Sequence, residues 1–247
     1  MLPICIGRYA LALHFSEAAL RERARERYAA FEHTSENGFP VYLNRPRPQP
    51  EARAEFAFSM NGFALELQSS FAECSGVQNE YALDSLLRVL LSVKLLPEPG
   101  FLIHAATIAR DGRSHVFMGR SGAGKSTVAR NAPAGAALTD EISLVRRIDG
   151  VWHAHGTPFW GEFRAGNQNK SLPLAGIYSL VQAPRNCARP LATRDALHQL
   201  LPNVLFFSTH RRHRDALLRV TSEIAAQVPF FRLEFTRDIS FWEAIAR

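Results

Sequence analysis

The chain has 247 residues, 47% of them hydrophobic, and a formal net charge of +6 with a pI of about 9.6. This length can bury the core of one domain, or of one domain with a smaller companion. No apolar run approaches the roughly 18 residues that mark a membrane span, and residues 1–8 lack the basic lead and apolar stretch of a signal peptide. The sequence therefore predicts a globular cytoplasmic protein with no membrane partner.

Neither the cysteines nor the basic residues indicate a specialised class of protein. Cys5, Cys74 and Cys187 are odd in number and far apart, so they predict three reduced, buried thiols rather than a disulfide framework or a zinc site. The arginines are spread widely, and a protein that handles anionic nucleotides can be basic without binding nucleic acid. The dense basic cluster at 210–214 favours a solvated face or a substrate-facing patch, so no nucleic-acid partner is expected.

Residues 1–100 predict a small α+β domain of unknown role. Its predicted elements, in chain order, are a strand at 7–15, an exposed amphipathic helix at 16–32, a strand at 41–44, a proline-rich surface connection at 45–50, a hairpin at 55–68 that turns at Asn61-Gly62, and an apolar helix at 81–96. The helix is closed by Pro97-Glu98-Pro99-Gly100, and we place a domain boundary there.

Residues 101–247 predict a second, α/β domain. Its predicted elements are a strand at 101–108, a turn at Asp111-Gly112, a strand at 115–118, a helix at 127–131, strands at 137–145, 151–155 and 174–182, a mostly helical stretch at 193–226, a strand at 230–235 and a short terminal helix. This half contains every polar constellation that the sequence offers.

A phosphate-binding loop is the strongest motif of the chain. Residues 119–127 match G-x-x-x-x-G-K-[ST] at every fixed position, between a strand-like and a helix-like run. Glycines let successive backbone N–H groups point into one concavity, and the following helix adds its positive dipole end. Lys125 is expected on the terminal phosphates and Ser126 on Mg²⁺. The predicted nucleotide-binding residues are Gly119, Arg120, Ser121, Gly122, Ala123, Gly124, Lys125, Ser126 and Thr127.

Two adjacent acids lie at the centre of the predicted strand 137–145. Buried acids are costly without a cation, and side chains alternate along a strand, so Asp140 and Glu141 are expected on opposite faces. One would reach the metal and the nucleotide, and the other the substrate hydroxyl. The alternative is the end of a surface strand. His104 is weak evidence alone, because a histidine on an apolar strand is more often a packed core residue.

The order of these residues resembles that of a known family. His104 before a hairpin, the loop 119–127, the acidic pair at 140–141 and the segment 162–166 occur as in the catalytic domain of bacterial HPr kinase/phosphorylase. The end of the chain, at 228–243, is similar to the shorter relatives of that enzyme, which include serine kinases that modify lasso-peptide precursors. The resemblance covers residues 101–247 and implies a nucleotide-binding fold of the phosphoenolpyruvate-carboxykinase type.

The resemblance also implies a role for each matching residue. The family has two aspartates where this chain has Asp140 and Glu141, and the second accepts the substrate proton, so Glu141 is expected to be the base. Asp140 is the alternative, because a glutamate reaches one methylene further. The implied catalytic residues are His104, Lys125, Asp140, Glu141 and Arg164, and the implied metal ligands are Ser126, Asp140 and Glu162.

The resemblance implies a kinase that uses ATP and Mg²⁺ to phosphorylate a hydroxyl, with a serine of a peptide or protein favoured. A free small-molecule hydroxyl, as in serine, a sugar or an inositol, is one alternative. A nucleotide-binding regulatory protein without catalysis is another. The family's stretch for phosphate-driven dephosphorylation has no counterpart at 228–231, so efficient phosphorylase activity is not expected. Oligomers are common in that family, and a homo-oligomer is therefore an expectation too.

Overall fold

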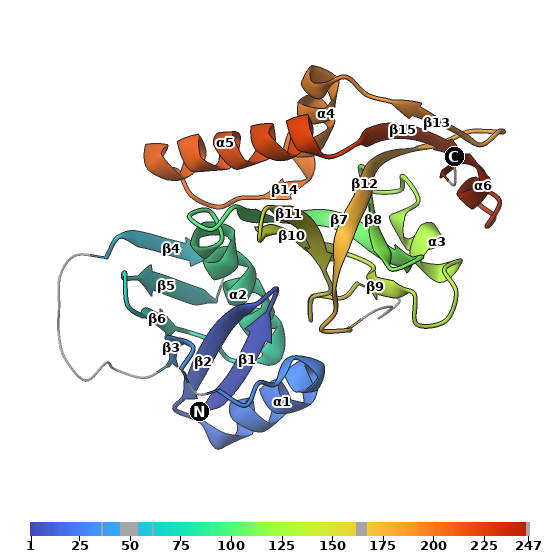
Figure 1. The fold of residues 1–247 in the computed structure, drawn as a ribbon. Coiled ribbons are helices and arrows are strands. Elements are labelled where there is room, and N and C mark those ends of the chain that lie inside the picture. The colour runs from blue at the N-terminus through green and yellow to red at the C-terminus, as the bar shows by residue number, and fades with distance from the viewer. Residues whose placement is uncertain (36, 45–53, 61, 162–166, 246–247) are drawn as a thin grey trace.

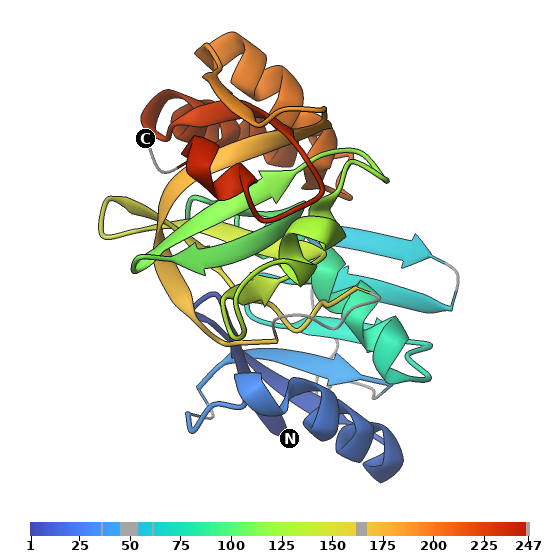
Figure 2. The same cartoon turned by 90° about the vertical axis from the view of Figure 1, so that its right-hand side faces the viewer.

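Two β-sheets with helices packed around them make up the protein (Figures 1 and 2). The computed structural model describes residues 1–35, 37–44, 54–60, 62–161 and 167–245. Within these residues the first sheet has six strands, in the order β1-β2-β3-β6-β5-β4, and the second has nine, along the path β11-β10-β7-β8-β12-β15-β13 with β9 and β14 on β7. The predicted mixed α/β class is confirmed.

The first sheet is built by the N-terminal residues. Its elements are β1 (Leu2–Ile6), β2 (Tyr9–Phe15), α1 (Ala18–Tyr28), the 3₁₀ helix η1 (Ala29–Phe31), β3 (Phe39–Leu43), β4 (Phe56–Met60), β5 (Phe63–Leu67), β6 (Ala72–Ser75) and α2 (Glu80–Lys94). The predicted helices and hairpin are confirmed, while β1 and β6 were not predicted. The strand expected at 7–15 begins at Tyr9, because Gly7 and Arg8 form a turn with φ of 59° and 63°. Residues 45–50 and Asn61 lie outside the described residues.

The second sheet carries the phosphate-binding motif. Its elements are β7 (Gly100–Arg110), β8 (Arg113–Met118), α3 (Lys125–Arg130), β9 (Ala137–Thr139), β10 (Ile142–Ile148), β11 (Val151–His155), β12 (Ser171–Gln182), β13 (Cys187–Pro190), α4 (Thr193–Leu200), η2 (Leu201–Asn203), β14 (Val204–Leu205), α5 (Arg211–Gln227), β15 (Phe230–Phe235) and α6 (Phe241–Ile245). Strand β12 is long and bent (Figure 1), so it pairs with β11 near its start and with β8 and β15 further on.

Two predicted elements of this half are interrupted. The strand expected at 137–145 is broken at Asp140 and Glu141, where Thr139 Oγ1 donates to the Ile142 carbonyl (3.0 Å) across the two acids. The stretch expected to be helical at 193–226 is broken by η2 and β14, because the chain there pairs with β7 before α5 begins. At each interruption the chain also contacts β7, which is distant in the sequence: Ala105 donates its N–H to the Glu141 carbonyl, and β14 pairs with Leu102 and Ile103.

Helix α2 joins the two sheets through one hydrophobic core. Asn79 caps it by accepting from the backbone N–H groups of Tyr81 and Ala82, and most of its apolar side chains are fully buried. The same core includes Leu102, Ile142 and Leu144 of the second sheet, and Phe159 of the loop between β11 and β12. The predicted boundary near residue 100 therefore divides the chain into two sheets that share buried contacts, and its status as a domain boundary stays a prediction.

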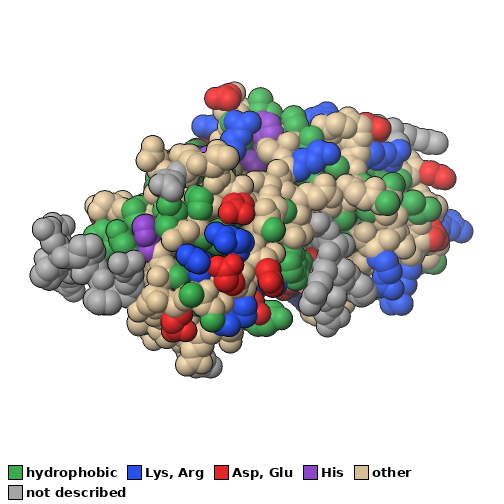
Figure 3. All heavy atoms as spheres, turned by 90° about the horizontal axis from the view of Figure 1, so that it is seen from below, with side chains coloured by type: hydrophobic (Ala, Val, Ile, Leu, Met, Phe, Trp, Pro, Cys, Tyr) green, Lys and Arg blue, Asp and Glu red, His purple; other side chains and the backbone are tan. Residues whose placement is uncertain are grey.

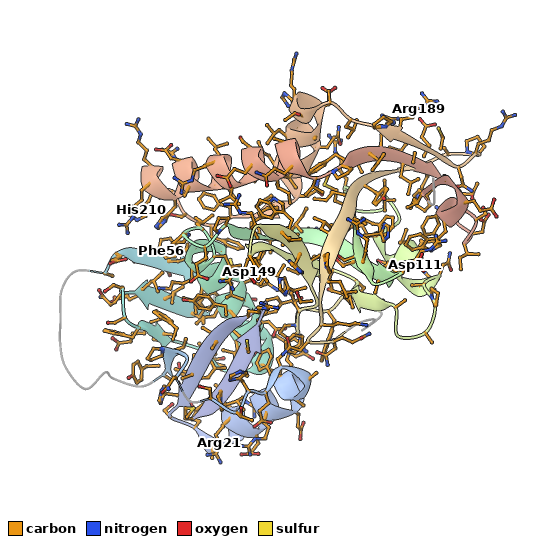
Figure 4. All side chains as sticks on the ribbon, viewed as in Figure 1. Arg21, Phe56, Asp111, Asp149, Arg189 and His210 are labelled. Atoms are coloured by element: carbon orange, nitrogen blue, oxygen red, sulfur yellow. The ribbon has the colours of Figure 1, made fainter. Side chains whose placement is uncertain are left out.

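A second contact between the halves lies at the start of α5. The ring of Phe56 on β4 packs edge-on against His210, with centroids 6.1 Å apart, and Figure 4 shows the two labelled side chains close together. His213 packs against the same Phe56 ring at 5.9 Å. The basic cluster at 210–214 is thus partly a packing surface for the first sheet.

Charged side chains of both signs lie interspersed on the face that carries α1, seen from below in Figure 3. Exposed pairs such as Arg23 with Glu80 (3.1 Å) contribute only ~0–1 kcal/mol each. Leu20, Ala24 and Tyr28 are the buried residues of this helix. Their packing, and not the surface pairs, holds α1 in place.

The three cysteines are free thiols. Cys74 is buried as predicted, whereas Cys5 and Cys187 are half-buried. Cys5 differs because β1 buries alternate residues, Leu2, Ile4 and Ile6, and turns Cys5 to the other face. None of the helices in the described part of the chain has both the length and the apolar character to cross a membrane.

Candidate functional site

One cavity of about 380 Å³ brings together most of the predicted site. We call it the phosphate-loop cavity. The predicted residues that line it are His104, Ser121, Gly122, Gly124, Lys125, Ser126, Thr127, Asp140 and Glu141, and three further residues, Gly161, Gln182 and Arg237, complete it. Glu162 and Arg164 lie outside the described residues, so their predicted roles stay predictions.

The phosphate-binding loop depends on glycine at two positions. Gly122 and Gly124 have φ of 77° and 113°, in the left-handed region that favours glycine. A Cβ at Gly124 would lie 2.4 Å from Cζ of Phe235, so the loop packs too closely on β15 for any side chain. Lys125 is 7% exposed and its Nζ donates to the carbonyls of Gly119 (2.7 Å) and Arg120 (3.2 Å). The loop therefore wraps around its own lysine.

Asp140 and Glu141 face the same cavity. The prediction that they point to opposite faces is wrong, because the chain leaves the strand at these two residues and the alternation no longer applies. Asp140 is 3% exposed and its Oδ1 accepts from the backbone N–H of Gly161 (2.8 Å). A Cβ at Gly161 would contact both acids, at 3.3 Å from Glu141 Cβ and 3.5 Å from Asp140 Oδ2. A side chain at position 161 would therefore crowd both carboxylates, and glycine leaves space beside them.

His104 reaches the cavity from the neighbouring strand. It lies on β7 opposite Ile142 of β10, and the next residue, Ala105, donates its N–H to the carbonyl of Glu141 (2.9 Å). The register of β7 against β10 therefore fixes the histidine beside the acidic pair. The alternative of a packed core histidine does not hold for His104, which is half-buried and lines the cavity.

Burial dominates the electrostatics of this cavity. Desolvation raises the pKa of Glu141, and the positive charge of Arg88 opposes that rise. Desolvation also lowers the pKa of Lys125 and of His104, and the charges of Lys125 and Arg88 lower that of His104 further. A histidine with a lowered pKa is neutral at pH 7, and a carboxylate with a raised pKa is a stronger base.

Two polar residues that the sequence did not predict hold the loop in place. Gln182 Nε2 donates to the Gly122 carbonyl (2.7 Å), and Arg237 Nη2 donates to Gln182 Oε1 (2.9 Å). Strands β8, β12 and β15 are parallel neighbours, so their carboxyl ends meet at one edge. Gln182 ends β12 and Arg237 follows β15. If the parallel pairing of these strands were known, Gln182 and Arg237 could be predicted to lie beside the loop.

The donor set fits Mg²⁺ bound together with a phosphate. Mg²⁺ usually keeps several waters and takes one or two carboxylates plus substrate phosphates, and Ser126 and Asp140 offer a hydroxyl and a carboxylate in the cavity. The described residues contain no group of three or more His, Cys, Asp or Glu side chains able to hold a metal alone. Ser126 and Asp140 therefore fit a metal ion that takes further ligands from phosphate and water.

A second cavity, of about 580 Å³, adjoins the loop on its other side. It shares Ser121, Gly122 and Gln182 with the phosphate-loop cavity and extends to His198 and Asn203 near η2. The loop therefore lies between two hollows, which together offer more space than a phosphate chain needs.

Comparisons with known proteins give a family and distantly similar solved structures. A solved structure of the Hpr(Ser) kinase/phosphatase from Coxiella burnetii is similar at 13% sequence identity and a TM-score of 0.28, over 51% of this chain and 90% of that chain. Likeness this low leaves the function to be argued from the site. No curated protein matches the sequence. A family model described as SynChlorMet cassette protein ScmC matches residues 81–247, from α2 to the end of the chain. The chain therefore belongs to the SynChlorMet cassette protein ScmC family.

Proposed function

We propose that this protein is a kinase that transfers the γ-phosphoryl group of ATP to a hydroxyl. The observation that carries the proposal is the meeting of Lys125 and Ser126 of the loop with Asp140, Glu141 and His104 in one cavity. Phosphoryl transfer requires little from a protein beyond positioning and charge stabilisation. A phosphate-binding loop alone would support nucleotide binding, and the acids and the histidine supply what a transfer reaction adds.

Glu141 is the proposed base. Its pKa is raised by burial, and a carboxylate with a raised pKa accepts a hydroxyl proton more readily. Asp140 is less suited to that role, because its Oδ1 already accepts the Gly161 N–H. We therefore assign the substrate proton to Glu141 and a metal-binding role to Asp140.

His104 acts as a neutral hydrogen-bonding partner in this proposal. Its lowered pKa leaves it uncharged at pH 7, so it cannot stabilise charge as an imidazolium. One ring nitrogen can donate and the other accept. Beside Glu141 it would orient the carboxylate or the acceptor hydroxyl.

The nucleotide would extend along the loop. Lys125 and the backbone N–H groups of the loop would hold its β- and γ-phosphates. Ser126 and Asp140 would hold Mg²⁺, which when bound neutralises charge on the phosphate oxygens. The cavity on the other side of the loop, which reaches His198, offers space for the nucleoside.

A serine of a peptide or protein is the favoured acceptor, and a free small-molecule hydroxyl is the second candidate. A nucleotide-binding regulatory protein without turnover is the alternative of a different class. A regulatory protein that transfers nothing would not need a carboxylate with a raised pKa in the cavity of the phosphate-binding loop. Glu141 is such a carboxylate, so the site favours a kinase. Efficient phosphorylase activity is not part of the proposal.

The test is transfer of label from [γ-³²P]ATP to a panel of acceptors in the presence of Mg²⁺. The panel contains serine, sugars, inositols and serine-containing peptides, and Lys125→Ala is the matched variant. Labelled product from the wild type and none from the variant supports the proposal. Intact nucleotide binding with no labelled product across the panel favours the regulatory alternative.

A further inference from the structure

A third cavity, of about 370 Å³, opens beside the acidic pair. It meets the phosphate-loop cavity at Gly161, which lines both. Its other lining residues come mainly from the first sheet's helices: Arg27, Tyr81, Asp84, Ser85, Arg88 and Trp160. We call it the Arg88 cavity. Gly161 thus connects this cavity with the one that contains Glu141.

Asp84, the acidic residue that lines the Arg88 cavity, is already paired with Arg27. Asp84 accepts from Arg27 Nε (2.9 Å) and from Tyr28 Oη (2.6 Å), and Arg27 and Asp84 form a buried ion pair. Arg27 also lies over the ring of Trp160, 4.4 Å from its centroid. Arg27 and Asp84 thus hold each other in place and leave Arg88 as the excess positive charge of the cavity lining.

Arg88 is built to receive an anion. Its Nε is fully buried and has no hydrogen-bond partner within the described part of the chain, and its guanidinium lies over the ring of Phe159, 5.2 Å from the centroid. A buried donor without a partner is costly unless a ligand satisfies it. The stacked guanidinium is held rigid, and arginine is the side chain that best fits a planar carboxylate.

The positive charge of Arg88 also acts on Glu141 and His104. It lowers the pKa of both Glu141 and His104. Because Gly161 lines both this cavity and the phosphate-loop cavity, an anion bound to Arg88 would lie on the side of Gly161 that leads toward Glu141.

We propose that the Arg88 cavity binds the acceptor, and that the acceptor carries a carboxylate close to the hydroxyl that is phosphorylated. This inference rests on the proposed kinase function and narrows its acceptors. The carboxylate can belong to a free hydroxy acid such as serine, or to an acidic side chain next to the acceptor serine of a peptide. Arg88 would hold the carboxylate while Gly161 leaves the way open to Glu141.

The test measures binding and transfer separately, with two pairs of probes in which a carboxylate is replaced by its amide. The member with the carboxylate is called the charged probe, and the member with the uncharged amide the neutral probe. The first pair is serine and serinamide. The second is an end-blocked Gly-Asp-Ser-Gly peptide and its Gly-Asn-Ser-Gly counterpart. Binding to the full chain saturated with Mg²⁺ and a non-hydrolysable ATP analogue is measured by calorimetry, and transfer by labelled ATP. We expect the charged member of at least one pair to bind about tenfold tighter or more, as for a charge-assisted hydrogen bond.

Variants show whether Arg88 is the cause. Arg88→Met should remove the preference for the charged probe, Arg88→Lys should restore part of it, and both should bind the ATP analogue as the wild type does. Lys94→Met on the same helix, whose ammonium packs over Phe39, is the control and should keep the preference. A preference for serine over serinamide indicates a free hydroxy acid as the acceptor, and a preference for the Asp peptide over the Asn peptide indicates an acidic side chain beside the acceptor serine.

Each outcome bears on one claim. Equal binding of charged and neutral probes, or a preference that survives Arg88→Met, overturns the inference and leaves kinase activity standing if transfer is seen. A preference that depends on Arg88 without any transfer supports the binding site and counts against the kinase proposal.

Discussion

At the scale of single residues, the site depends on charges held in a half-buried cavity. Lys125 Nζ is bound by the carbonyls of Gly119 and Arg120, so its position is fixed by the loop itself. We expect Lys125→Ala to reduce phosphoryl transfer by at least about a hundredfold, because oriented charge on a transferring phosphoryl group is worth several kcal/mol. Steady-state kinetics check this, with circular dichroism as the control for folding. Transfer at the wild-type rate would refute the assigned role.

Glu141 gives a prediction on pH. The pKa of this carboxyl is raised by burial, and the base must be ionised to accept a proton. Transfer should therefore fall as the pH drops through that raised pKa, by about tenfold per pH unit for a single group. Because Arg88 opposes the rise, Arg88→Met should move this acid limb to higher pH. An unchanged limb in that variant would show that Glu141 is not the titrating base.

The same group links stability to function. A carboxyl whose pKa is raised on folding stabilises the protein only at low pH, and that contribution is lost as the pH rises through the folded pKa. We expect Glu141→Gln to abolish most of the transfer and to unfold at a higher denaturant midpoint than the wild type at neutral pH, with the two midpoints converging in acid. A lower midpoint at neutral pH would mean that the carboxylate is structurally required.

At the scale of elements, the phosphate-binding loop and the strands beside it define the site. Gly124→Ala should lower stability by about 1–3 kcal/mol and abolish nucleotide binding, because a Cβ would have both an unfavourable φ and a clash with Phe235. Gly112→Ala is the matched control, since it also has positive φ but meets nothing within 4 Å. It should cost about 1 kcal/mol and leave nucleotide binding intact. Equal binding losses in both variants would contradict this reading.

Elements with strong local signals were predictable from the sequence. The loop, helix α2 and the β7–β8 hairpin carry their signals in adjacent residues: the glycines and lysine of the motif, an apolar run ended by prolines, and the Asp111-Gly112 turn. The break at Asp140 and Glu141 was not predictable, because there the backbone N–H of Gly161, 21 residues further along the chain, donates to Asp140. Gln182 and Arg237 were missed for the same reason, as only the parallel pairing of β8, β12 and β15 brings them to the loop.

Arg88 and Asp84 are a feature of the sequence that indicates a buried polar cluster on α2. They lie four residues apart in an otherwise strongly apolar helix, so they share one face of it. Two opposite charges on one face of a buried helix are costly unless they meet partners. Asp84 meets Arg27 of α1, and Arg88 packs over Phe159 of the loop after β11, and the sequence alone places neither segment beside α2.

At the scale of the whole molecule, the two sheets share a core and a site. Leu102, Ile142, Leu144 and Phe159 pack among the side chains of the first sheet and α2, and the Arg88 cavity takes residues from both halves. We therefore expect a fragment of residues 101–247 to lack a cooperative thermal transition, since it would expose that apolar surface to water. Calorimetry of the fragment and of the full chain checks this. Cooperative unfolding of the fragment with nucleotide binding retained would show an independent domain.

The most direct measurement of the central claim is a ³¹P NMR time course of the full chain with Mg·ATP and the acceptor panel. We predict that the γ-phosphate signal of ATP declines as ADP and a phosphomonoester signal grow in equal amounts, and that none of this occurs with Lys125→Ala. A γ-phosphate signal that persists while ATP remains bound, or that is converted to inorganic phosphate alone, would contradict the assignment of a hydroxyl kinase.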